Sequence, residues 1–413
     1  MNDSTPLRER RRRAMAFVLA GGKGQRLEPL TVHSPKPAVT FGGIYRIIDF
    51  TLSNCLNSEI RNIYVLVQYK SADLIRHVRD GWQMYFSTPR GEYLEIIPPQ
   101  YDHSDQQYVG TADAIYQNLY LVEQEQPDEV VILAGDHIYK MDYRRMIEAH
   151  RANDADLTVG AVEVPLRDGA QFGIIQADAS GRVTGFQEKP AAPAPIPGNA
   201  EHCFASMGIY VFKPGVLIDL LKKDGADPTS SHDFGKDIIS KLVSSGRVFA
   251  HSFLDENRKT AKYWRDVGTL DAYYSANMDL IGVDPILNLY DETWPIRTAG
   301  VQGPPPKTVF RDDGRTGSAL DSMLSPGVIV SGGVVENSIL SPHVNVHSWA
   351  HVSDSILFKR VDVGRRARVR RAIVAEGVRI PPDAVIGYDA EADRKRFLIT
   401  AGGIVVVPRD AKI

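Results

Sequence analysis

The chain has 413 residues, 43% of them hydrophobic and 24% charged, which excludes a disordered, collagenous or coiled-coil protein and predicts roughly two to three domains. With 48 Lys and Arg against 51 Asp and Glu, its net charge of −3 argues against nucleic-acid or membrane-surface partners, and no apolar run reaches the roughly 18–20 residues of a membrane helix. Only two cysteines, Cys55 and Cys203, are present, so a disulfide scaffold is excluded and a cytoplasmic location is expected.

Residues 1–13 form a basic leader that contains Arg8 and the run 10–13. We expect a mobile, solvated segment, and a contact with phosphate or RNA is the alternative. No long apolar stretch precedes a small-residue cleavage site, so no secretory signal is expected. The apolar run 16–20 then ends in Gly-Gly, which is typical of a buried parallel strand followed by a tight loop.

Similar apolar runs recur along the chain and alternate with helix-like segments. The expected strands are 63–67, 130–134, 157–162 and 206–212, and the expected helices are 49–58, 112–124 and 143–153. This alternation predicts α/β units around a mostly parallel, Rossmann-like sheet, in a domain that spans 14–298. The Pro- and Ala-rich segment 191–198 is expected to be a surface loop inside this domain.

A second domain is predicted after a linker at 299–322, which contains Gly303 and three successive prolines at 304–306. Apolar residues within 323–413 recur every six positions, in three series. The series are Leu340, Val346, Val352 and Phe358; Leu357, Val363 and Val369; and Val374, Ile380 and Ile386. A period of six favours a parallel β-helix over ordinary β-hairpins, and such a solenoid offers a flat surface for contacts between subunits.

The loop after the first strand has the composition of a phosphate-binding loop. Glycines at 21, 22 and 24 allow close approach of the backbone to a ligand, and Lys23 and Arg26 supply charged donors. Lys36 stands between two prolines that restrict its backbone. The pattern is neither a Walker A loop nor a dinucleotide fingerprint, because Leu27 stands where the third glycine of that fingerprint belongs.

Two aspartates are candidate metal ligands. Asp136 follows the apolar run 130–134 and a glycine, and Asp266 also lies shortly before a glycine. A carboxylate at the end of a parallel strand lies at the edge where α/β sheets bind ligands, and Mg²⁺ prefers carboxylates, phosphate oxygens and water. The alternative for Asp136 is a turn or helix-cap residue.

These residues lie within longer phrases that resemble sugar-phosphate nucleotidylyltransferases. Gly-Gly-x-Gly-x-Arg-Leu-x-Pro-Leu-Thr at 21–31 and Pro-Lys-Pro-Ala at 35–38 carry the resemblance. Further phrases at 46–55, 110–114, 133–140, 231–237 and 263–270 narrow it to the glucose-1-phosphate adenylyltransferases of the bacterial glycogen pathway. The resemblance extends from about residue 14 to the C-terminus.

The resemblance implies Mg²⁺-dependent transfer of an adenylyl group from ATP to α-D-glucose 1-phosphate, which gives ADP-glucose and diphosphate. This reaction is the first committed step of glycogen biosynthesis. The family also implies a nucleotidyltransferase domain followed by a left-handed parallel β-helix of hexapeptide type, a homotetramer, and regulation by a small-molecule effector.

The resemblance assigns roles residue by residue. It gives catalytic roles to Arg26, Lys36, Asp136, Lys189 and Asp266, with Asp136 and Asp266 as metal ligands. It places the nucleotide at Leu19, Ala20, Gly21, Gly22, Lys23, Gln68, Gly110 and Thr111. It places the sugar phosphate at Tyr108, Gly173, Glu188, Lys189, Ser206, Tyr210, Asp233 and Trp264.

Alternatives to these roles follow from the residues themselves. Glu188 and Lys189 alone would indicate an exposed ion pair, Asp233 could cap a helix that begins at residue 234, and Trp264 could fill the core. For the whole chain, the alternatives are a transferase for another nucleotide or sugar phosphate, a regulatory subunit that binds without turnover, and a structural solenoid protein.

The sequence departs from some bacterial members of the family where their effectors bind. His33, Ser34 and Val109 replace basic residues in these regions, whereas Arg46 is retained. The usual sugar-phosphate activator is therefore not assigned. Five arginines between 365 and 371 are expected to form a solvated face of the solenoid, with an anion-binding face as the alternative.

Overall fold

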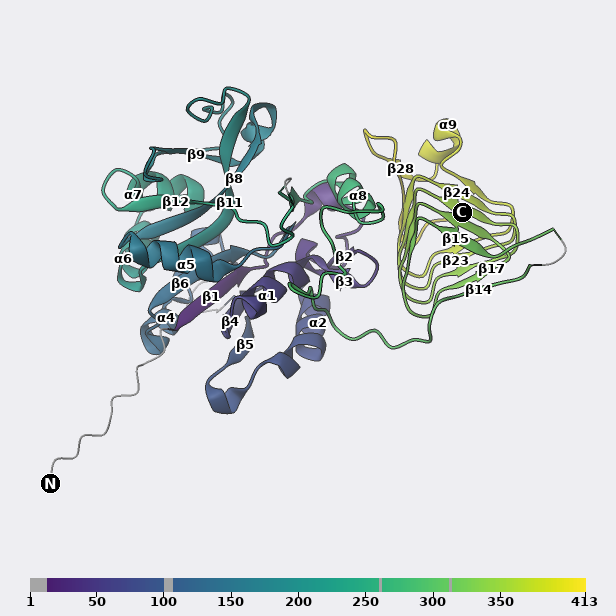
Figure 1. Cartoon of the computed structure of the whole chain (residues 1–413), viewed down its shortest axis with the longest axis horizontal. Coiled ribbons are helices and arrows are strands. Elements are labelled where there is room, and N and C mark those ends of the chain that lie inside the picture. The colour runs from purple at the N-terminus through teal and green to yellow at the C-terminus, as the bar shows by residue number, and fades with distance from the viewer. Residues whose placement is uncertain (1–12, 100–106, 260–261, 312–313) are drawn as a thin grey trace.

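The structure is a computed structural model that describes residues 13–99, 107–259, 262–311 and 314–413. Most of the basic leader, including Arg8 and the arginines at 10–12, lies outside these residues. Arg13 is described, and its guanidinium donates to Glu125 at 3.0 Å. Figure 1 shows an α/β domain and a β-helix, with a long extended segment that leads from the first to β14 (Lys307–Val309) of the second.

A nine-stranded sheet forms the centre of the N-terminal domain, in the order β10-β9-β11-β6-β1-β4-β5, with β8 beside β11 and β12 beside β8. Its parallel half contains β1 (Ala14–Leu19), β4 (Asn62–Leu66), β5 (Tyr93–Ile97) and β6 (Glu129–Ala134). The other strands are β8 (Leu157–Pro165), β9 (Gly173–Ala177), β10 (Val183–Glu188), β11 (His202–Phe212) and β12 (Val248–Ser252). Strand β11 runs antiparallel to β6, β8 and β9.

Helices cover both faces of this sheet. One face carries α1 (Ile47–Asn57), α2 (Ala72–Trp82) and α5 (Tyr143–Ala152). The opposite face carries α3 (Thr111–Tyr116), α4 (Leu119–Glu125), α6 (Pro214–Gly225), the π-helix η6 (Phe234–Ile239) and α7 (Ser240–Leu242). Because side chains alternate along a strand, Phe17 packs into one of the two cores and Val18 into the other.

Short elements complete the domain. The 3₁₀ turns are η1 (Gln25–Leu27), η2 (Lys36–Ala38), η3 (Gln83–Tyr85), η4 (Thr88–Arg90) and η5 (Leu166–Gln171). The remaining strands and helix are β2 (Thr40–Phe41), β3 (Tyr45–Arg46), β7 (His137–Tyr139), β13 (Trp264–Asp266) and α8 (Leu270–Met278). None of the described helices is long and apolar enough to cross a membrane.

The predicted mostly parallel α/β domain is confirmed, but the helix expected at 112–124 is two helices. Helix α3 ends at Tyr116 and α4 begins at Leu119. Between them, the side-chain amide of Asn118 donates to the carbonyl of Ala114 at 2.8 Å and to the hydroxyl of Tyr108 at 3.2 Å. An Asn side chain that bonds to the preceding turn competes with the helix ladder, which accounts for the break.

The C-terminal domain is a parallel β-helix with three sheets, as predicted. The first contains β14, β17 (Ile329–Ser331), β20 (Asn345–Val346), β23 (Asp362–Val363) and β26 (Arg379–Ile380). The second contains β15 (Ser318–Leu320), β18 (Val334–Glu336), β21 (His351–Ser353), β24 (Arg368–Arg370) and β27 (Val385–Ile386). The third contains β16 (Met323–Leu324), β19 (Ile339–Leu340), β22 (Ile356–Leu357), β25 (Ala372–Val374), β29 (Val405–Val407) and β28 (Leu398–Ile399), and α9 (Ala390–Arg394) follows β27.

Each central coil has 17 residues rather than three full hexads, because equivalent residues such as Ser338 and Ser355 are 17 apart. The chain turns at an equivalent position in each of these coils, where a non-glycine residue has a positive φ: Asn337 (47°), Asp354 (47°) and Arg371 (50°). The three hexad series therefore belong to three successive coils, and nearly all their side chains fill the interior. Phe358 is the exception: it packs between the two domains, because the shorter coil moves it out of the interior.

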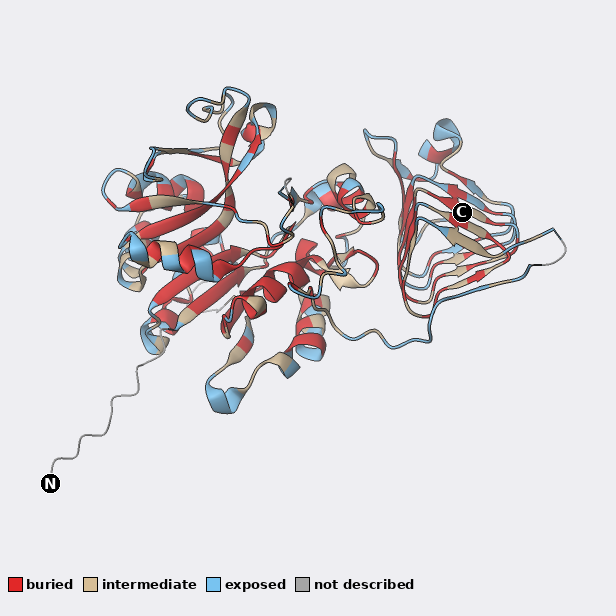
Figure 2. Cartoon of the chain, in the orientation of Figure 1, coloured by how far each residue is buried: buried red, intermediate tan, exposed pale blue. Residues whose placement is uncertain are grey.

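The β-helix begins earlier than the sequence pattern indicated. Within the expected linker, β14 pairs with β17 and β15 pairs with β18, so these strands already belong to the solenoid. The third sheet packs against the N-terminal domain through a shared apolar cluster that includes Phe41, Tyr273, Ile356 and Ile373. In Figure 2 buried residues follow the central strands of the α/β sheet and the coils of the solenoid.

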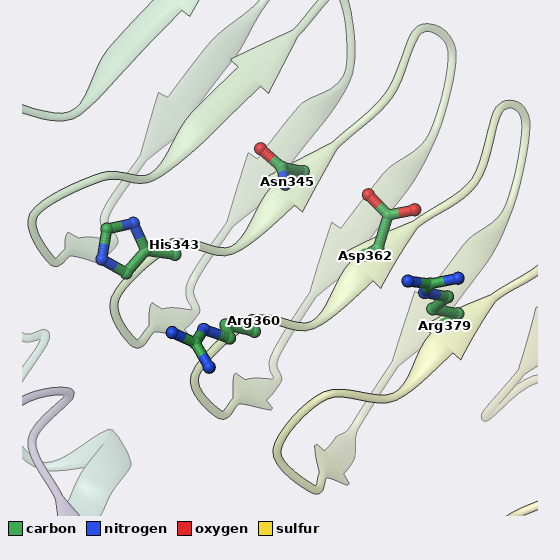
Figure 3. Close-up of a pocket in the computed structure, with 5 residues that line it drawn as sticks. All are labelled: His343, Asn345, Arg360, Asp362 and Arg379. Atoms are coloured by element: carbon green, nitrogen blue, oxygen red, sulfur yellow. The ribbon is translucent and has the colours of Figure 1, made fainter.

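A polar hollow of about 570 Å³ lies on the outer surface of the first β-helix sheet. It is lined by His343, Asn345, Arg360, Asp362 and Arg379, and Figure 3 shows these side chains on successive coils. The hollow contains none of the residues that the family resemblance assigns to the reaction.

Candidate active site

The two candidate metal ligands meet, although they are far apart in the sequence. Strands β7 and β13 form a small antiparallel sheet in which His137 lies opposite Asp266. Asp136 precedes β7, so the same pairing carries its carboxylate to Asp266. One ligand atom from each of Asp136, His137 and Asp266 lies within 4.8 Å of the others.

Lys36 lies between the two carboxylates. Its ammonium nitrogen is 2.9 Å from Oδ2 of Asp136 and 2.8 Å from Oδ1 of Asp266. Burial opposes the charge on Lys36, but the two carboxylates outweigh burial and raise the pKa of its ammonium. Burial would raise the pKa of Asp136, but Lys36 and His137 lower it well below its usual range. At neutral pH Lys36 is therefore an ammonium and Asp136 a carboxylate, each stabilised by the opposite charge of the other.

His137 is a member of this site that the sequence analysis missed. Its Nε2 is 3.6 Å from Oδ1 of Asp136 and 4.0 Å from Oδ1 of Asp266. Its ring packs against Trp264 at 5.1 Å. The buried Nδ1 of His137 and Nε1 of Trp264 have no hydrogen-bond partner among the described residues. The signal in the sequence was its position, directly after an aspartate at the end of a buried strand.

A cavity of about 350 Å³ opens beside Lys36 and Asp136, at the carboxyl ends of the parallel strands. It is lined by Leu19, Gly21, Gly22, Lys36, Pro37, Leu66, Gln68, Tyr108, Gly110, Thr111, Ala114, Ala134 and Asp136. Six of the eight residues expected to bind the nucleotide are therefore in its wall. Of the other two, Ala20 is buried, with its N–H bonded to Leu66, and Lys23 is exposed, with its ammonium 6.0 Å from the ring of Tyr69.

Arg26 is exposed beside the acids. A Cβ atom on Gly268 would lie 3.0 Å from Oδ1 of Asp266 and 3.1 Å from Nη2 of Arg26, so this glycine separates the two side chains. On the cavity wall, the amide of Gln68 donates to the carbonyl of Tyr108 at 3.2 Å. This bond leaves Oε1 of Gln68 as an acceptor, which is half of what a purine edge requires.

Gly110 is fixed by close packing against the segment that precedes η6. A Cβ atom on Gly110 would collide with the carbonyl oxygen of His232 and lie 2.6 Å from that of Ser231. We predict that Gly110→Ala displaces the cavity wall and lowers kcat/KM for ATP by about tenfold or more. Steady-state kinetics at saturating sugar phosphate would measure this. Gly215→Ala is the matched control, because a Cβ there meets no atom within 4 Å, and an equal loss in both variants would contradict the prediction.

Four of the expected sugar-phosphate residues, Gly173, Glu188, Ser206 and Tyr210, lie on the strands β9, β10 and β11, whereas Tyr108 lines the cavity described above. Glu188 is the last residue of β10, and its carboxylate packs closely against Gly173. A Cβ atom on Gly173 would lie only 2.9 Å from Oε2 of Glu188. The ion pair that the residues alone indicated is present, since Nζ of Lys189 lies 2.9 Å from Oε1 of Glu188. The Lys189 side chain is 64% exposed, so its ammonium is open to a ligand.

The other residues of this group have structural contacts. Ser206 accepts a bond from the N–H of Gly208 at 3.4 Å, and Tyr210 packs on Phe234 at 5.6 Å, where burial raises the pKa of its hydroxyl. Asp233 accepts from the N–H groups of residues 235 and 236 at 2.9 and 3.1 Å, so the predicted capping alternative is realised. Trp264 also packs against a phenylalanine ring at 5.2 Å.

The residues that depart from the family lie at the surface. Ser34 donates to Asp73 at 2.7 Å, and Val109 is 66% exposed. In the arginine stretch of the solenoid, Arg368 and Arg370 lie 4.1 and 4.6 Å from the ring of Tyr388. These arginines are exposed, as the sequence indicated for a solvated face.

Comparison with known proteins matches each domain to a family. Residues 15–282 match the nucleotidyl transferase family, and residues 304–407 match the GlmU-like C-terminal hexapeptide family. A glucose-1-phosphate adenylyltransferase of Rhodopirellula baltica is 52% identical over 97% of this chain and 91% of its own length. The chain belongs to the glucose-1-phosphate adenylyltransferase family. The Koribacter versatilis adenylyltransferase is 51% identical over 96% of this chain and 95% of its own length, so the likeness to this family includes both domains.

Proposed function

We propose that this chain transfers the adenylyl group of ATP to α-D-glucose 1-phosphate and releases diphosphate, the first committed step of glycogen biosynthesis. The proposal rests on the site geometry: a cavity with glycines in its wall opens beside two carboxylates and a buried lysine. The chain that carries this site is about half identical to glucose-1-phosphate adenylyltransferases. The cavity size suits a nucleotide, whose phosphates would lie toward Lys36 and Asp136.

In this proposal the phosphate oxygen of the sugar attacks the α-phosphorus of ATP, in line with the departing diphosphate. The nucleophile is already an anion, so no general base is required. Catalysis then depends on positioning and on stabilising negative charge. The backbone at 19–22 would bind phosphate oxygens, with Lys23, Arg26 and Lys36 as cationic donors, while the amide of Gln68 would bind the adenine edge.

Glu188 and Lys189 divide the sugar phosphate between them in this proposal. The ammonium of Lys189 would bind its phosphate and the carboxylate of Glu188 would accept its hydroxyls, which replaces their mutual ion pair of 2.9 Å by contacts with substrate. The rings of His137 and Trp264, which pack on each other beside the carboxylates, offer further polar atoms, since Nδ1 of His137 and Nε1 of Trp264 lack partners among the described residues.

Nucleotidyltransferases generally use Mg²⁺, and the donor set here fits that ion. Asp136 and Asp266 would hold it, because they offer hard oxygen ligands within 4.8 Å of each other and already bind one cation, the ammonium of Lys36. When bound, Mg²⁺ supplies positive charge to the phosphates that react.

The test is diphosphate release by the full chain with glucose 1-phosphate and, in turn, ATP, UTP and dTTP. We expect ATP to give the largest kcat/KM. Faster release with another nucleotide would establish the alternative transferase, and no release with any nucleotide that binds would establish a regulatory subunit.

We further propose a homotetramer, a small-molecule effector and a cytoplasmic location. The solenoid supports the first, since its flat sheets suit contacts between subunits. Cys55 and Cys203 support the last, since both are buried free thiols. Mass measurement in solution and an activity screen against central metabolites would test the first two.

A further inference from the structure

Lys36 occupies the position that a divalent cation requires. Its ammonium is within 2.9 Å of both carboxylates, and the residue is 6% exposed. The imidazole of His137 is farther from both acids, with its Nε2 at 3.6 and 4.0 Å. An ammonium and a divalent ion cannot share one position between the same two oxygens, because each must contact them directly.

The carboxylates need a cation even when no metal is bound. Their oxygens come within 4.8 Å of each other, and two like charges at that separation repel. Lys36 removes this repulsion in the chain without ligands, and it holds both carboxylates where a metal would need them.

The ammonium of Lys36 can also reach the nucleotide cavity. Lys36 also lines the nucleotide cavity, and its stem lies against the glycine-rich loop, where a Cβ on Gly24 would approach its Cβ to 3.0 Å. The flanking Pro35 and Pro37 restrict the backbone. Rotation about the side-chain bonds would therefore carry the ammonium from the acids to phosphates in the cavity without a backbone change.

We propose that Lys36 is a placeholder cation that keeps free divalent metal out of the site until nucleotide phosphates draw it away. Metal and nucleotide then enter together, and the ammonium that held the acids becomes a ligand of the phosphates. This inference rests on the proposed function for the identity of the nucleotide. Lys36 is thus a positioning residue in the free chain and a phosphate ligand in the loaded one.

The experiment measures binding of Mn²⁺ to the full chain by electron paramagnetic resonance, with and without a non-reacting α,β-methylene analogue of ATP. Without nucleotide, we expect Lys36→Met to bind Mn²⁺ at least about tenfold more tightly than the wild type. When the analogue is added, the wild type should also bind Mn²⁺ at least about tenfold more tightly than it does without the analogue.

Lys70→Met is the matched control. The Lys70 ammonium bonds to the carbonyl of Val32 and lies 4.7 Å from the ring of Tyr69, so its loss removes one positive charge that contacts neither acid. Unchanged Mn²⁺ affinity in Lys70→Met, together with the gain in Lys36→Met, supports the placeholder. Equal affinities in the wild type and Lys36→Met overturn it.

Folding is checked by thermal melting, and Lys36→Gln is the second variant if the methionine variant is unfolded. If neither folds, the wild type alone decides: Mn²⁺ affinity that is the same with and without the analogue overturns the proposal. Failure of the proposed function is distinguishable, because it would appear as a wild type that fails to form ADP-glucose, whatever its Mn²⁺ affinity.

Discussion

Asp136→Asn is expected to lower kcat for ADP-glucose formation by at least about 10³-fold while the chain stays folded. The amide keeps the shape of the side chain but removes the charge that the proposed metal site requires. Because the Asp136 side chain is 34% exposed, the substitution leaves no buried cavity. Diphosphate release measures the activity, and circular dichroism during heating measures the fold.

Asp80→Asn is the control for this experiment. Asp80 is an exposed aspartate of α2 whose carboxylate pairs with Arg79 at 2.7 Å, so its loss removes the same charge without changing either acid of the site. Full activity in Asp80→Asn together with the loss in Asp136→Asn assigns the effect to the site. Near-normal turnover by Asp136→Asn would remove the carboxylate from the mechanism.

The position of Asp136 could be predicted because it depends on a local pattern. A buried apolar run followed by glycine and a carboxylate indicates the end of a parallel strand, and β6 ends at Ala134 as that pattern requires. Asp266 has no such signal. It belongs to β13, a strand of three residues whose place is decided by pairing with β7. Without the family resemblance, the sequence offered no reason to bring the two acids together.

For Lys36 the residue type predicts that the side chain binds an anion, but not which anion it binds. Its charge, its flanking prolines and its place after a phosphate-binding loop indicated an anion-binding group. In the structure its anions are the two carboxylates. Side-chain contacts between segments 100 and 230 residues apart depend on the whole fold, so no local pattern contains them.

The β-helix was predictable as an architecture but not in its register. The hexad spacing identified the solenoid, because interior side chains must repeat with the coil. Three hexads make 18 residues, whereas each central coil has 17, so the hexad pattern falls one residue out of step with each coil. Phe358 therefore lies outside the interior. The break between α3 and α4 had a similar origin, since one Asn side chain interrupts a segment whose apolar pattern continues.

Lys189→Ala is expected to raise KM for glucose 1-phosphate by about tenfold to a hundredfold and to change KM for ATP by less than about twofold. A charge-assisted bond to the sugar phosphate accounts for that range, since hydrogen bonds to charged groups contribute about 1.5–3 kcal/mol. The backbone of Lys189 has a φ of 43°, and alanine carries the same Cβ as lysine. The substitution therefore tests the ammonium without changing the conformational cost of the residue.

Lys222→Ala is the matched control for this second experiment, and Glu188→Gln separates the two members of the ion pair. Lys222 is a comparably exposed lysine, at 57%, and pairs with Glu123 at 2.8 Å across helices α6 and α4. Its removal should leave both KM values unchanged.

Because the carboxylate of Glu188 is assigned to sugar hydroxyls, Glu188→Gln should also raise KM for the sugar phosphate and leave KM for ATP unchanged. Equal increases in KM for both substrates in Lys189→Ala would show instead that this lysine serves the nucleotide or the packing of the β10 end, and the phosphate of the sugar would need another cation.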